Sequence, residues 1–372
     1  MVLVAMLIGG ANASAQTHHD KHAKGGEHCE ATKVFTETAR KGFQQPHNPQ
    51  FIFTAPNNKF MLGIGATVTL RTSYDFMGAM GNIDFVPYDI PMTKGYANQQ
   101  RVMMDASTSR IFLKGVINTD CLGRIVAYTD IDFQGPNAYN FRFTEMIRWE
   151  HTCWDKHIKF GVAAEVPTVN ASYGEHFSAI YQRVPDGIAY LQYAWGENRT
   201  SHIRVSGVIR DMYLHNNRTG ENTTELGWGV QLSGHIEAGK WVDLYMNGVY
   251  GRGITPYIND LMGTPYDITY DPNDPTRLQT LPMWGWQAAA QVNIMPNKFW
   301  LAGGYSEVHL EKHNGVLSDT QYSRGHYIFA NAFYNVTNNF TVALEYLHGG
   351  RVNASDAKGD ANRLSIMAQY NF

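Results

Sequence analysis

Long hydrophobic runs, charged residues and cysteines are all scarce in this sequence of 372 residues. Beyond residue 15 no apolar run reaches the roughly 20 residues that a membrane-spanning helix needs, which excludes a helical membrane bundle. Charged residues make up 17% of the chain, whereas an average globular protein has roughly 25%. The net charge of −3 gives no electrostatic reason to expect a nucleic acid partner. Hydrophobic residues make up 44%, which is enough to exclude disorder and leaves a large β-rich protein.

The first residues have the composition of an export signal. Residues 1–11 are nearly all apolar, and Ala13 and Ala15 place small side chains where signal peptidase requires them, just before Gln16. We therefore expect a signal peptide over 1–15, a periplasmic N-terminal extension over 16–59 and a β domain over 60–372.

The β domain consists of segments that alternate polar and apolar residues. In the last segment Leu364, Ile366 and Ala368 share one face, and Arg363 and Ser365 share the other. This period of two is typical of a strand with two different faces. Fourteen such segments can be counted: 60–74, 110–118, 124–133, 141–151, 156–165, 186–195, 201–212, 223–237, 240–251, 284–295, 298–310, 324–335, 339–347 and 363–372.

The connections between these segments fall into two alternating classes. Every second connection is a tight turn, and the others are longer, notably 75–108, 166–185, 252–283, 311–323 and 348–361. Short turns at one rim and long loops at the other are typical of a transmembrane, antiparallel up-and-down β-barrel with periplasmic turns and extracellular loops. The predicted fold class is therefore all-β, with such a barrel spanning the outer membrane.

The chain ends on the apolar face of its last segment. Tyr370 and Phe372 follow three apolar alternates on that face, a pattern similar to the signal that the barrel-assembly machinery reads. The alternative is an ordinary buried terminal strand.

Charged residues share the other face in several segments. Arg110 and Lys114, for example, alternate with Ile111 and Leu113. A charge on the lipid face near the midplane costs roughly 2–4 kcal/mol, so we expect the charged face to line a polar interior. The predicted pore-lining residues are Arg110, Lys114, Arg124, Asp130, Asp132, Arg142, Arg148, Glu150, Lys159, Glu165, Arg183, Arg204 and Arg210.

Short motifs spread over 60–372 resemble the DcaP-like family of outer-membrane porins. They are GIGATVTLRTSYD (63–75), SRIF (109–112), AYTDIDFQG (127–135), FRFTE (141–145), QRVPD (182–186) and LEYLHGGR (344–351). The resemblance implies a homotrimer of sixteen-stranded barrels that admits small solutes and prefers anions. The count of fourteen departs from this, and a missing hairpin would have to lie in 75–108 or 252–283.

The arginines between residues 110 and 210 predict which solutes pass. A planar guanidinium matches carboxylate and phosphate geometry, which favours small organic anions as the transported partners. The alternative is that these arginines pair with neighbouring acids and only stiffen the wall. The connection 166–185, with Tyr173, Glu175 and His176, is the predicted constriction loop, because long barrel loops often fold into the lumen.

Two further groups carry possible chemistry. Cys121 and Cys153 both lie in short turns and are equidistant from residue 137, so we predict that they meet at the rim and form a disulfide, which the periplasm permits. His18, His19, His22 and the adjacent His28-Cys29 form a His-rich tract after the export signal. Such a tract can bind zinc or copper, or can simply be a solvated leader, and residues 29–43 carry apolar residues near helical spacing.

The sequence leaves three alternatives to a porin open. An outer-membrane barrel hydrolase would need a nucleophile, but the sequence has no nucleophile-elbow motif and its histidines are scattered. An exported soluble β protein that binds glycans would turn its apolar face inward. A closed structural or adhesin barrel would conduct nothing. The prediction is a non-enzymatic channel without a cofactor, with outer-membrane lipids and solutes as its partners.

Overall fold

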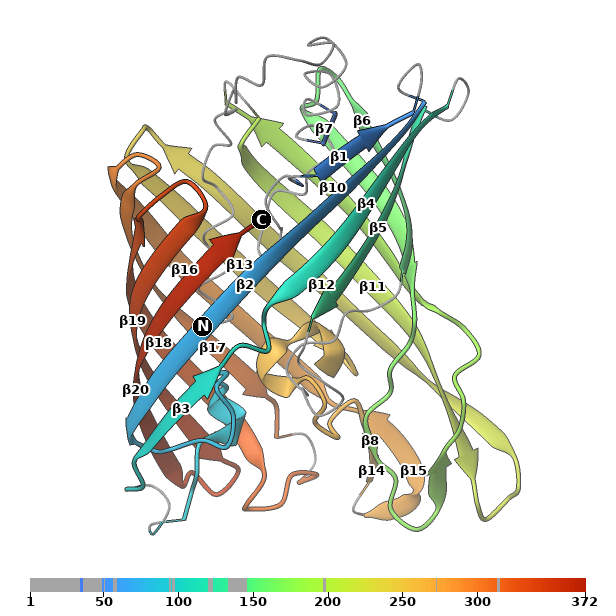
Figure 1. The fold of residues 1–372 in the computed structure, drawn as a ribbon. Helices are drawn as coiled ribbons and strands as arrows, with labels where there is room; N and C mark the ends of the chain where they lie inside the picture. The colour runs from blue at the N-terminus through green and yellow to red at the C-terminus, as the bar shows by residue number, and fades with distance from the viewer. Residues whose placement is uncertain are drawn as a thin grey trace, which may run out of the picture.

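The computed structural model describes residues 34–35, 49, 51–55, 59–93, 95, 98–119, 123–132, 146–196, 199–271, 273–312 and 315–372. Within these residues the fold is an antiparallel up-and-down barrel (Figure 1). The barrel strands are β2 (Phe60–Met77), β3 (Arg101–Asp105), β4 (Arg110–Thr119), β5 (Gly123–Asp132), β6 (Met146–Cys153), β7 (Ile158–Glu165), β10 (Asp186–Trp195), β11 (Ser201–Asn216), β12 (Asn222–Ala238), β13 (Val242–Arg252), β16 (Pro282–Met295), β17 (Phe299–Leu310), β18 (Tyr322–Asn335), β19 (Phe340–Asn353) and β20 (Lys358–Asn371).

The first and last strands pair with each other. β20 runs antiparallel to β2, with Asn371 opposite Thr67. β3 and β4 both pair with β2, at Arg71↔Asp105 and Thr67↔Arg110, so they are two parts of one interrupted strand. Counted in this way, the described residues supply fourteen barrel strands, in agreement with the count from the sequence. The two further strands that the family resemblance implies are not among the described residues.

The long connections all lie at one rim, which is the lower rim in Figure 1. Two short connections lie there as well, 217–221 between β11 and β12 and 354–357 between β19 and β20, whereas the upper rim carries short turns. The prediction of a long loop over 348–361 was wrong, because β19 continues to Asn353 and β20 starts at Lys358.

Five short strands lie outside the ring of barrel strands. β1 (Phe51–Thr54) pairs with Met61–Ile64 of β2, where β20 has already ended. At the lower rim, β8 (Ala171–Ser172), β14 (Ile268–Asp271) and β15 (Asp274–Thr280) form a small separate sheet. β9 (Phe177–Ala179) pairs with the end of β11.

The two faces of the wall differ as the alternation predicted. On β2 the side chains of Val68, Leu70 and Tyr74 are exposed on the outside, whereas Arg71 and Ser73 between them are buried on the inside. Water-facing polar groups inside and an apolar outer band are the reverse of a soluble barrel. No helix among the described residues is long and apolar enough to cross a membrane.

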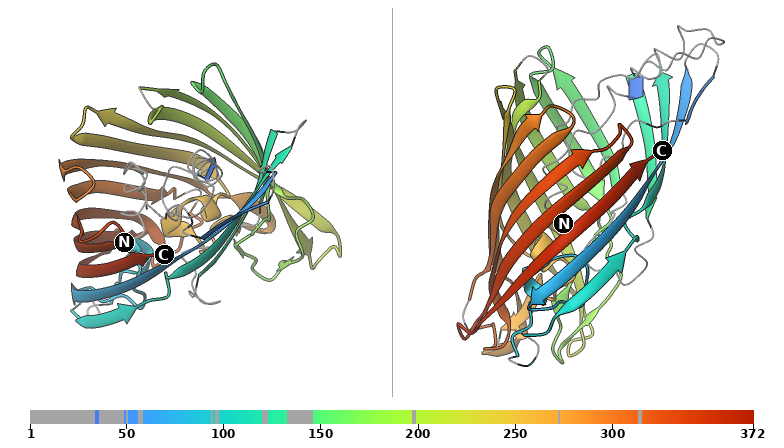
Figure 2. Two further views of the ribbon diagram at one scale, coloured as in Figure 1. Left: turned by 45° about the horizontal axis from the view of Figure 1, so that its top comes forward. Right: turned by 60° about the vertical axis from the view of Figure 1, so that its left-hand side comes forward.

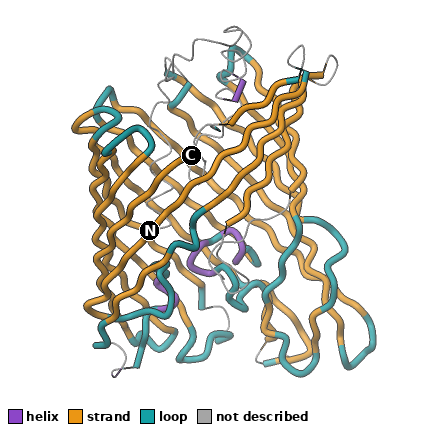
Figure 3. Tube along the Cα trace, viewed as in Figure 1, coloured by secondary structure: helices purple, strands orange, loops and turns teal. Residues whose placement is uncertain are grey.

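Two segments of the lower connections fold into the barrel. One holds the short 3-10 helix η2 (Pro87–Asp89), and the other holds η3 (Thr255–Tyr257) and η4 (Asn259–Leu261). Figure 2 shows the second segment inside the ring of strands, and Figure 3 marks these helical turns. The two larger clusters of buried apolar residues in the described part of the chain gather around these segments.

Candidate functional site: the lumen wall and its two inward segments

The segment 253–267, here called the lumen segment, closes part of the barrel interior. After β13, Gly253 takes a φ of 62°, a left-handed conformation that glycine adopts without strain, and the chain turns inward. Ile254, Ile258 and Leu261 of the segment are buried against the inner wall. Apolar side chains in a loop at the rim of a barrel gain stability only by such burial, at roughly 25 cal/mol per Å².

Arg210 fixes the lumen segment to the wall. From the inner face of β11 its guanidinium pairs with Asp186 of β10 at 3.0 Å and with Asp267 of the lumen segment at 3.0 Å. It also donates hydrogen bonds to the backbone carbonyls of Gly253 and Thr168. Its side chain has no exposed surface. Because the carboxylates and carbonyls take up its charge and donors, Arg210 acts as a strut and contributes no open positive surface.

The other inward segment has its own arginine anchors. Arg71 of β2 pairs with Asp84 at 2.8 Å. Arg363 of β20 pairs with Asp75 and donates to the carbonyls of Ile83 and Asn82. The sequence analysis did not include Arg71 and Arg363 among the site residues, although the alternation of charged and apolar residues predicts that both face inward. No sequence pattern predicts that loop residues such as Asp84 are their partners.

An open polar cluster remains on the inner wall of β6, β7, β10 and β11. Glu150 lies at its centre, with Lys159 at 2.8 Å and Arg148 at 3.2 Å. The Tyr190 hydroxyl donates to Glu150 at 2.8 Å, and the Arg204 guanidinium lies 4.6 Å from the Tyr190 ring centroid. About a third of the Glu150 and Lys159 side chains is exposed, so water reaches this cluster.

Twelve of the thirteen predicted pore-lining residues fall into three groups. Arg110, Arg148, Glu150, Lys159 and Arg204 lie on the inner face, neither enclosed like Arg210 nor outside the wall. Lys114, Glu165 and Arg210 also face inward but are engaged: Lys114 is buried and donates to the Phe35 carbonyl, and Glu165 accepts from the Tyr257 hydroxyl. The side chains of Arg124, Asp130 and Asp132 and the whole of Arg142 lie outside the described residues.

Two corrections follow from these positions. Arg210 does not line the open lumen, because the lumen segment covers it. Arg183 lies outside the wall: it pairs with Asp211 at 3.0 Å, and Asp211 shares a face of β11 with the exposed Ile209. The sequence could not show either arrangement, since both partners are distant in the chain.

The predicted constriction loop contacts the lumen segment at one end only. The Thr168 carbonyl accepts from Arg210, and the Asn170 amide donates to Asp267 at 3.1 Å. Tyr173 packs beside the cluster around Ile268, Glu175 is exposed, and His176 is half-buried at the lower rim. The role of these three residues in constriction stays a prediction. The sequence analysis did not predict that the segment 253–267 folds into the lumen, although its three buried apolar residues are unusual for a barrel loop.

The remaining predictions fall partly on undescribed residues. The His-rich tract, the export signal and Cys121 lie outside the described part of the chain, and Cys153 at the end of β6 forms no disulfide with a described residue. The disulfide therefore stays a prediction.

Val34 and Phe35 are helical and buried against the inner wall beside Met61 and Val116. Tyr370 and Phe372 point outward, with ring centroids 4.7 Å apart.

The sequence matches no family model and no curated protein. Its structure is similar to the crystal structure of the outer-membrane channel DcaP of Acinetobacter baumannii, with a TM-score of 0.69, 13% identity, and coverage of 86% of this chain and 99% of that one. Lower similarity is found to a porin refined at 1.8 Å (TM-score 0.48, 8% identity, 84% and 100% covered) and to the trimer form of OmpT of Vibrio cholerae (TM-score 0.47, 10% identity, 84% and 99% covered). The resemblance to DcaP-like porins is thus confirmed for the fold.

Proposed function

We propose that this chain is an outer-membrane porin for the passive diffusion of small hydrophilic solutes, with a preference for small organic anions. The observation that carries the proposal is the open cluster on the inner wall, where Arg148, Lys159 and Arg204 surround a single carboxylate, that of Glu150. The shape and polarity of the barrel support its location in the outer membrane, because an apolar outer band over a polar interior suits lipid outside and water inside.

The anion preference rests on which charges remain uncompensated. Arg71, Arg210 and Arg363 are neutralised by buried carboxylates, so they add little to the potential in the lumen. In the open cluster three cations face one acid, and Arg204 hydrogen-bonds the neutral Gln192 at 3.0 Å instead of a carboxylate. A wall with a net positive charge raises the local concentration of anions.

The test is single-channel recording in a planar bilayer, with the reversal potential measured in a salt gradient. Stepwise openings with an anion-selective reversal potential support the proposal. A unit charge about 8 Å from a permeating ion contributes roughly 0.5 kcal/mol in water, attractive for an anion and repulsive for a cation. Arg204→Gln should therefore lower the anion-to-cation permeability ratio about fivefold. The matched control is Arg324→Gln, which removes the same charge from the outer face, where Arg324 lies near Glu307.

Each contrary outcome has a distinct meaning. Openings without anion selectivity would retain the porin and reject the arginine wall, in favour of arginines that only stiffen the barrel. No openings from folded, detergent-extracted protein would favour a closed structural barrel.

We also propose a division of the chain into the export signal 1–15, a periplasmic extension over 16–59 and the barrel, and assembly into a homotrimer. The small hydrophilic solutes, the membrane lipids and the assembly machinery are its proposed partners. Native mass spectrometry of the detergent-extracted protein tests both proposals, since the mass of the protomer gives the cleavage site and the mass of the complex gives the number of subunits.

A further inference from the structure

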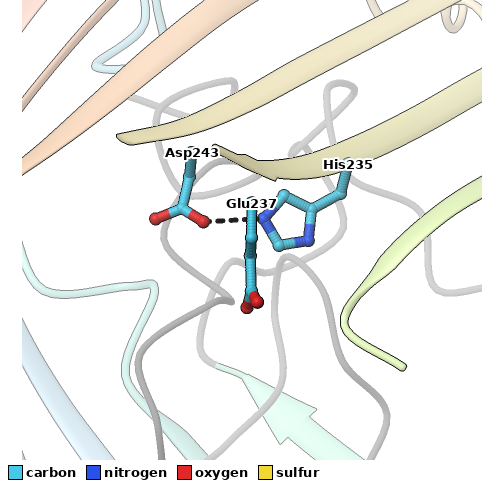
Figure 4. A group of neighbouring side chains, drawn as sticks. All are labelled: His235, Glu237 and Asp243. Carbon is cyan, nitrogen blue, oxygen red and sulfur yellow. Dashed lines mark hydrogen bonds and ion pairs between the residues drawn. The ribbon is translucent and has the colours of Figure 1, made fainter. Parts of the chain in front are cut away.

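Three potential metal ligands meet on the inner wall beside a short turn. His235 and Glu237 lie near the end of β12, and Asp243 lies near the start of β13, directly opposite Glu237 in the register. One ligand atom from each residue lies within 4.8 Å of the other two. Figure 4 shows the imidazole turned toward the Asp243 carboxylate, with Glu237 extending beside it.

Both ring nitrogens of His235 face atoms that accept hydrogen bonds. Its Nδ1 lies 3.1 Å from the Thr200 carbonyl oxygen, and its Nε2 lies 3.0 Å from Asp243 Oδ1. Both partners only accept hydrogen bonds, whereas a neutral imidazole has a single N–H. If Nδ1 donates to Thr200, then Nε2 faces Asp243 with either a second proton or a bound cation. The Tyr245 ring, stacked at 4.7 Å, holds the imidazole in this orientation.

The surroundings also hold an excess of acceptor atoms. Like charges directly opposite each other in a sheet are destabilising, yet Glu237 and Asp243 occupy such a pair. Among the described residues no lysine or arginine forms an ion pair with either carboxylate. Asp243 Oδ2 accepts from Asn293 Nδ2 at 2.9 Å, which fixes its orientation. Gln291, opposite Asp243 in the register, is 3% exposed and its Oε1 has no hydrogen-bond partner.

We propose that His235, Glu237 and Asp243 bind a divalent transition-metal ion, with Zn²⁺ as the expected occupant. His235 Nε2 and one oxygen from each carboxylate are its ligands, and a fourth position faces the barrel interior. A mixed nitrogen and oxygen set suits zinc, whereas Ca²⁺ and Mg²⁺ prefer oxygen ligands alone. The Nδ1–H donating to a backbone carbonyl is the arrangement that commonly orients a metal-binding histidine. The ion gives His235 Nε2 a partner and neutralises the two facing carboxylates.

The experiment is calorimetric titration of Zn²⁺ into the full-length, chelator-treated protein, purified without a histidine tag. The variants are His235→Phe, which keeps a ring for Tyr245 to stack on, and Glu237→Gln, which changes an exposed side chain. The matched control is His309→Phe. His309 also stacks on an aromatic ring, that of Trp284 at 3.9 Å, and contacts the Glu307 carboxylate at 2.6 Å, but no third ligand lies beside it among the described residues.

Loss of a residue that only supports a metal ligand costs about 10–100-fold in affinity. We therefore expect His235→Phe to lose one binding equivalent or to weaken it by more than roughly 100-fold, with a smaller loss in Glu237→Gln and none in the control. The His-rich tract near the N-terminus is present in every variant, so only the difference between variants is interpreted. Titration with Co²⁺ should give the visible absorption of a four-coordinate site in the wild type and control only.

Equal zinc stoichiometry and affinity in the wild type and His235→Phe would overturn the proposal. Loss of binding in Glu237→Gln, even if His235→Phe did not fold, would still support it. Unchanged binding in Glu237→Gln together with no Co²⁺ absorption in the wild type would overturn it.

Discussion

Arg210 on the barrel wall and Asp267 on the lumen segment form an ion pair of 3.0 Å in which neither side chain has any exposed surface. The two residues are 57 positions apart, and Asp267 also accepts hydrogen bonds from the amide and hydroxyl of Thr255 at 2.8 and 2.9 Å. A buried ion pair is favourable only when its remaining donors and acceptors are satisfied. In this pair the remaining donors and acceptors are satisfied, so the pair specifies one position for the lumen segment inside the barrel.

Arg210→Met should release the lumen segment. The substitution leaves Asp186 and Asp267 buried without a cation, which costs about 3–5 kcal/mol. We expect the amides of 253–267 to exchange hydrogen much faster, measured by mass spectrometry of the protein in detergent, while the barrel strands stay protected. The single-channel current should become noisier, because a loose segment moves within the conducting path.

Arg199→Gln is the control for this prediction. Arg199 pairs with Asp155 at 2.8 Å, but Asp155 is 83% exposed, and such surface pairs contribute less than about 1 kcal/mol. If the amides of 253–267 exchanged hydrogen equally fast in Arg210→Met and Arg199→Gln, Arg210 would not be the residue that holds the lumen segment on the wall.

Asp260 makes the docking of the lumen segment depend on pH. Burial in η4, together with the nearby charge of Asp89, raises the pKa of Asp260 from 3.8 to about 7. Between these two values the docked segment keeps a proton that the undocked segment loses. Docking is therefore favoured at low pH and weakens as the pH rises toward 7. Tyr322, Tyr266 and Arg351 are the other titratable groups of this contact.

Hydrogen exchange over 253–267, corrected for the intrinsic rate at each pH, measures this effect. The opening constant should rise by up to about tenfold per pH unit between pH 4 and 7. Asp260→Asn keeps the shape of the side chain and removes this proton equilibrium, so its opening constant should change much less with pH than that of the wild type. A wild-type opening constant that does not change with pH would contradict the prediction.

The strands could be predicted because a transmembrane barrel imposes one rule on every strand. Charges such as Arg148 and Lys159 must face inward, and apolar neighbours such as Ile147 must face lipid, so alternation alone gave both the segments and their inner faces. The rule failed at 348–361. There Gly349 and Gly350 interrupt the alternation, and the inner face of β19 packs on an inward loop residue, Phe85, instead of meeting water.

The arrangement of the lumen was less predictable, because it depends on contacts between distant residues. Arg210 and Arg204 look alike in the sequence, since both alternate with apolar residues on one strand. Only the position of Asp267 separates the buried strut from the open cation. A sequence that shows inward charges therefore predicts a polar interior, but it does not predict which of those charges remain free.

Cys121 and Cys153 are predicted to form a disulfide at the rim of short turns. Cys153 ends β6 next to the turn at 154–157, and Cys121 falls in the sequence between the end of β4 at Thr119 and the start of β5 at Gly123. Tryptic digestion with and without reduction, followed by mass spectrometry of protein exported to the periplasm, measures the bridge. A linked peptide pair that disappears on reduction is the expected result. Two free thiols in exported, folded protein would contradict it.

Phe372 has two separable roles, one in its backbone and one in its ring. Its amide donates to the Ala66 carbonyl at 2.8 Å and its carbonyl accepts from the Ala66 amide at 3.3 Å, so the backbone joins the last residue to β2. The ring points outward and is 47% exposed. If the ring is an assembly signal, Phe372→Ala should reduce the amount of barrel in the outer membrane of cells severalfold. Refolding of the purified variant in detergent should change by no more than about 0.5 kcal/mol, because both backbone hydrogen bonds remain.

Ile366→Ala provides the comparison, because Ile366 lies on the same strand and is 55% exposed on the same outer face. It loses a similar apolar contact with lipid but leaves the terminal aromatic residue in place. Assembly in cells should therefore stay near the wild-type amount for Ile366→Ala and fall only for Phe372→Ala. If both variants assembled equally poorly in cells, or if Phe372→Ala failed to refold in detergent, the ring would matter for the stability of the strand and not for recognition by the assembly machinery.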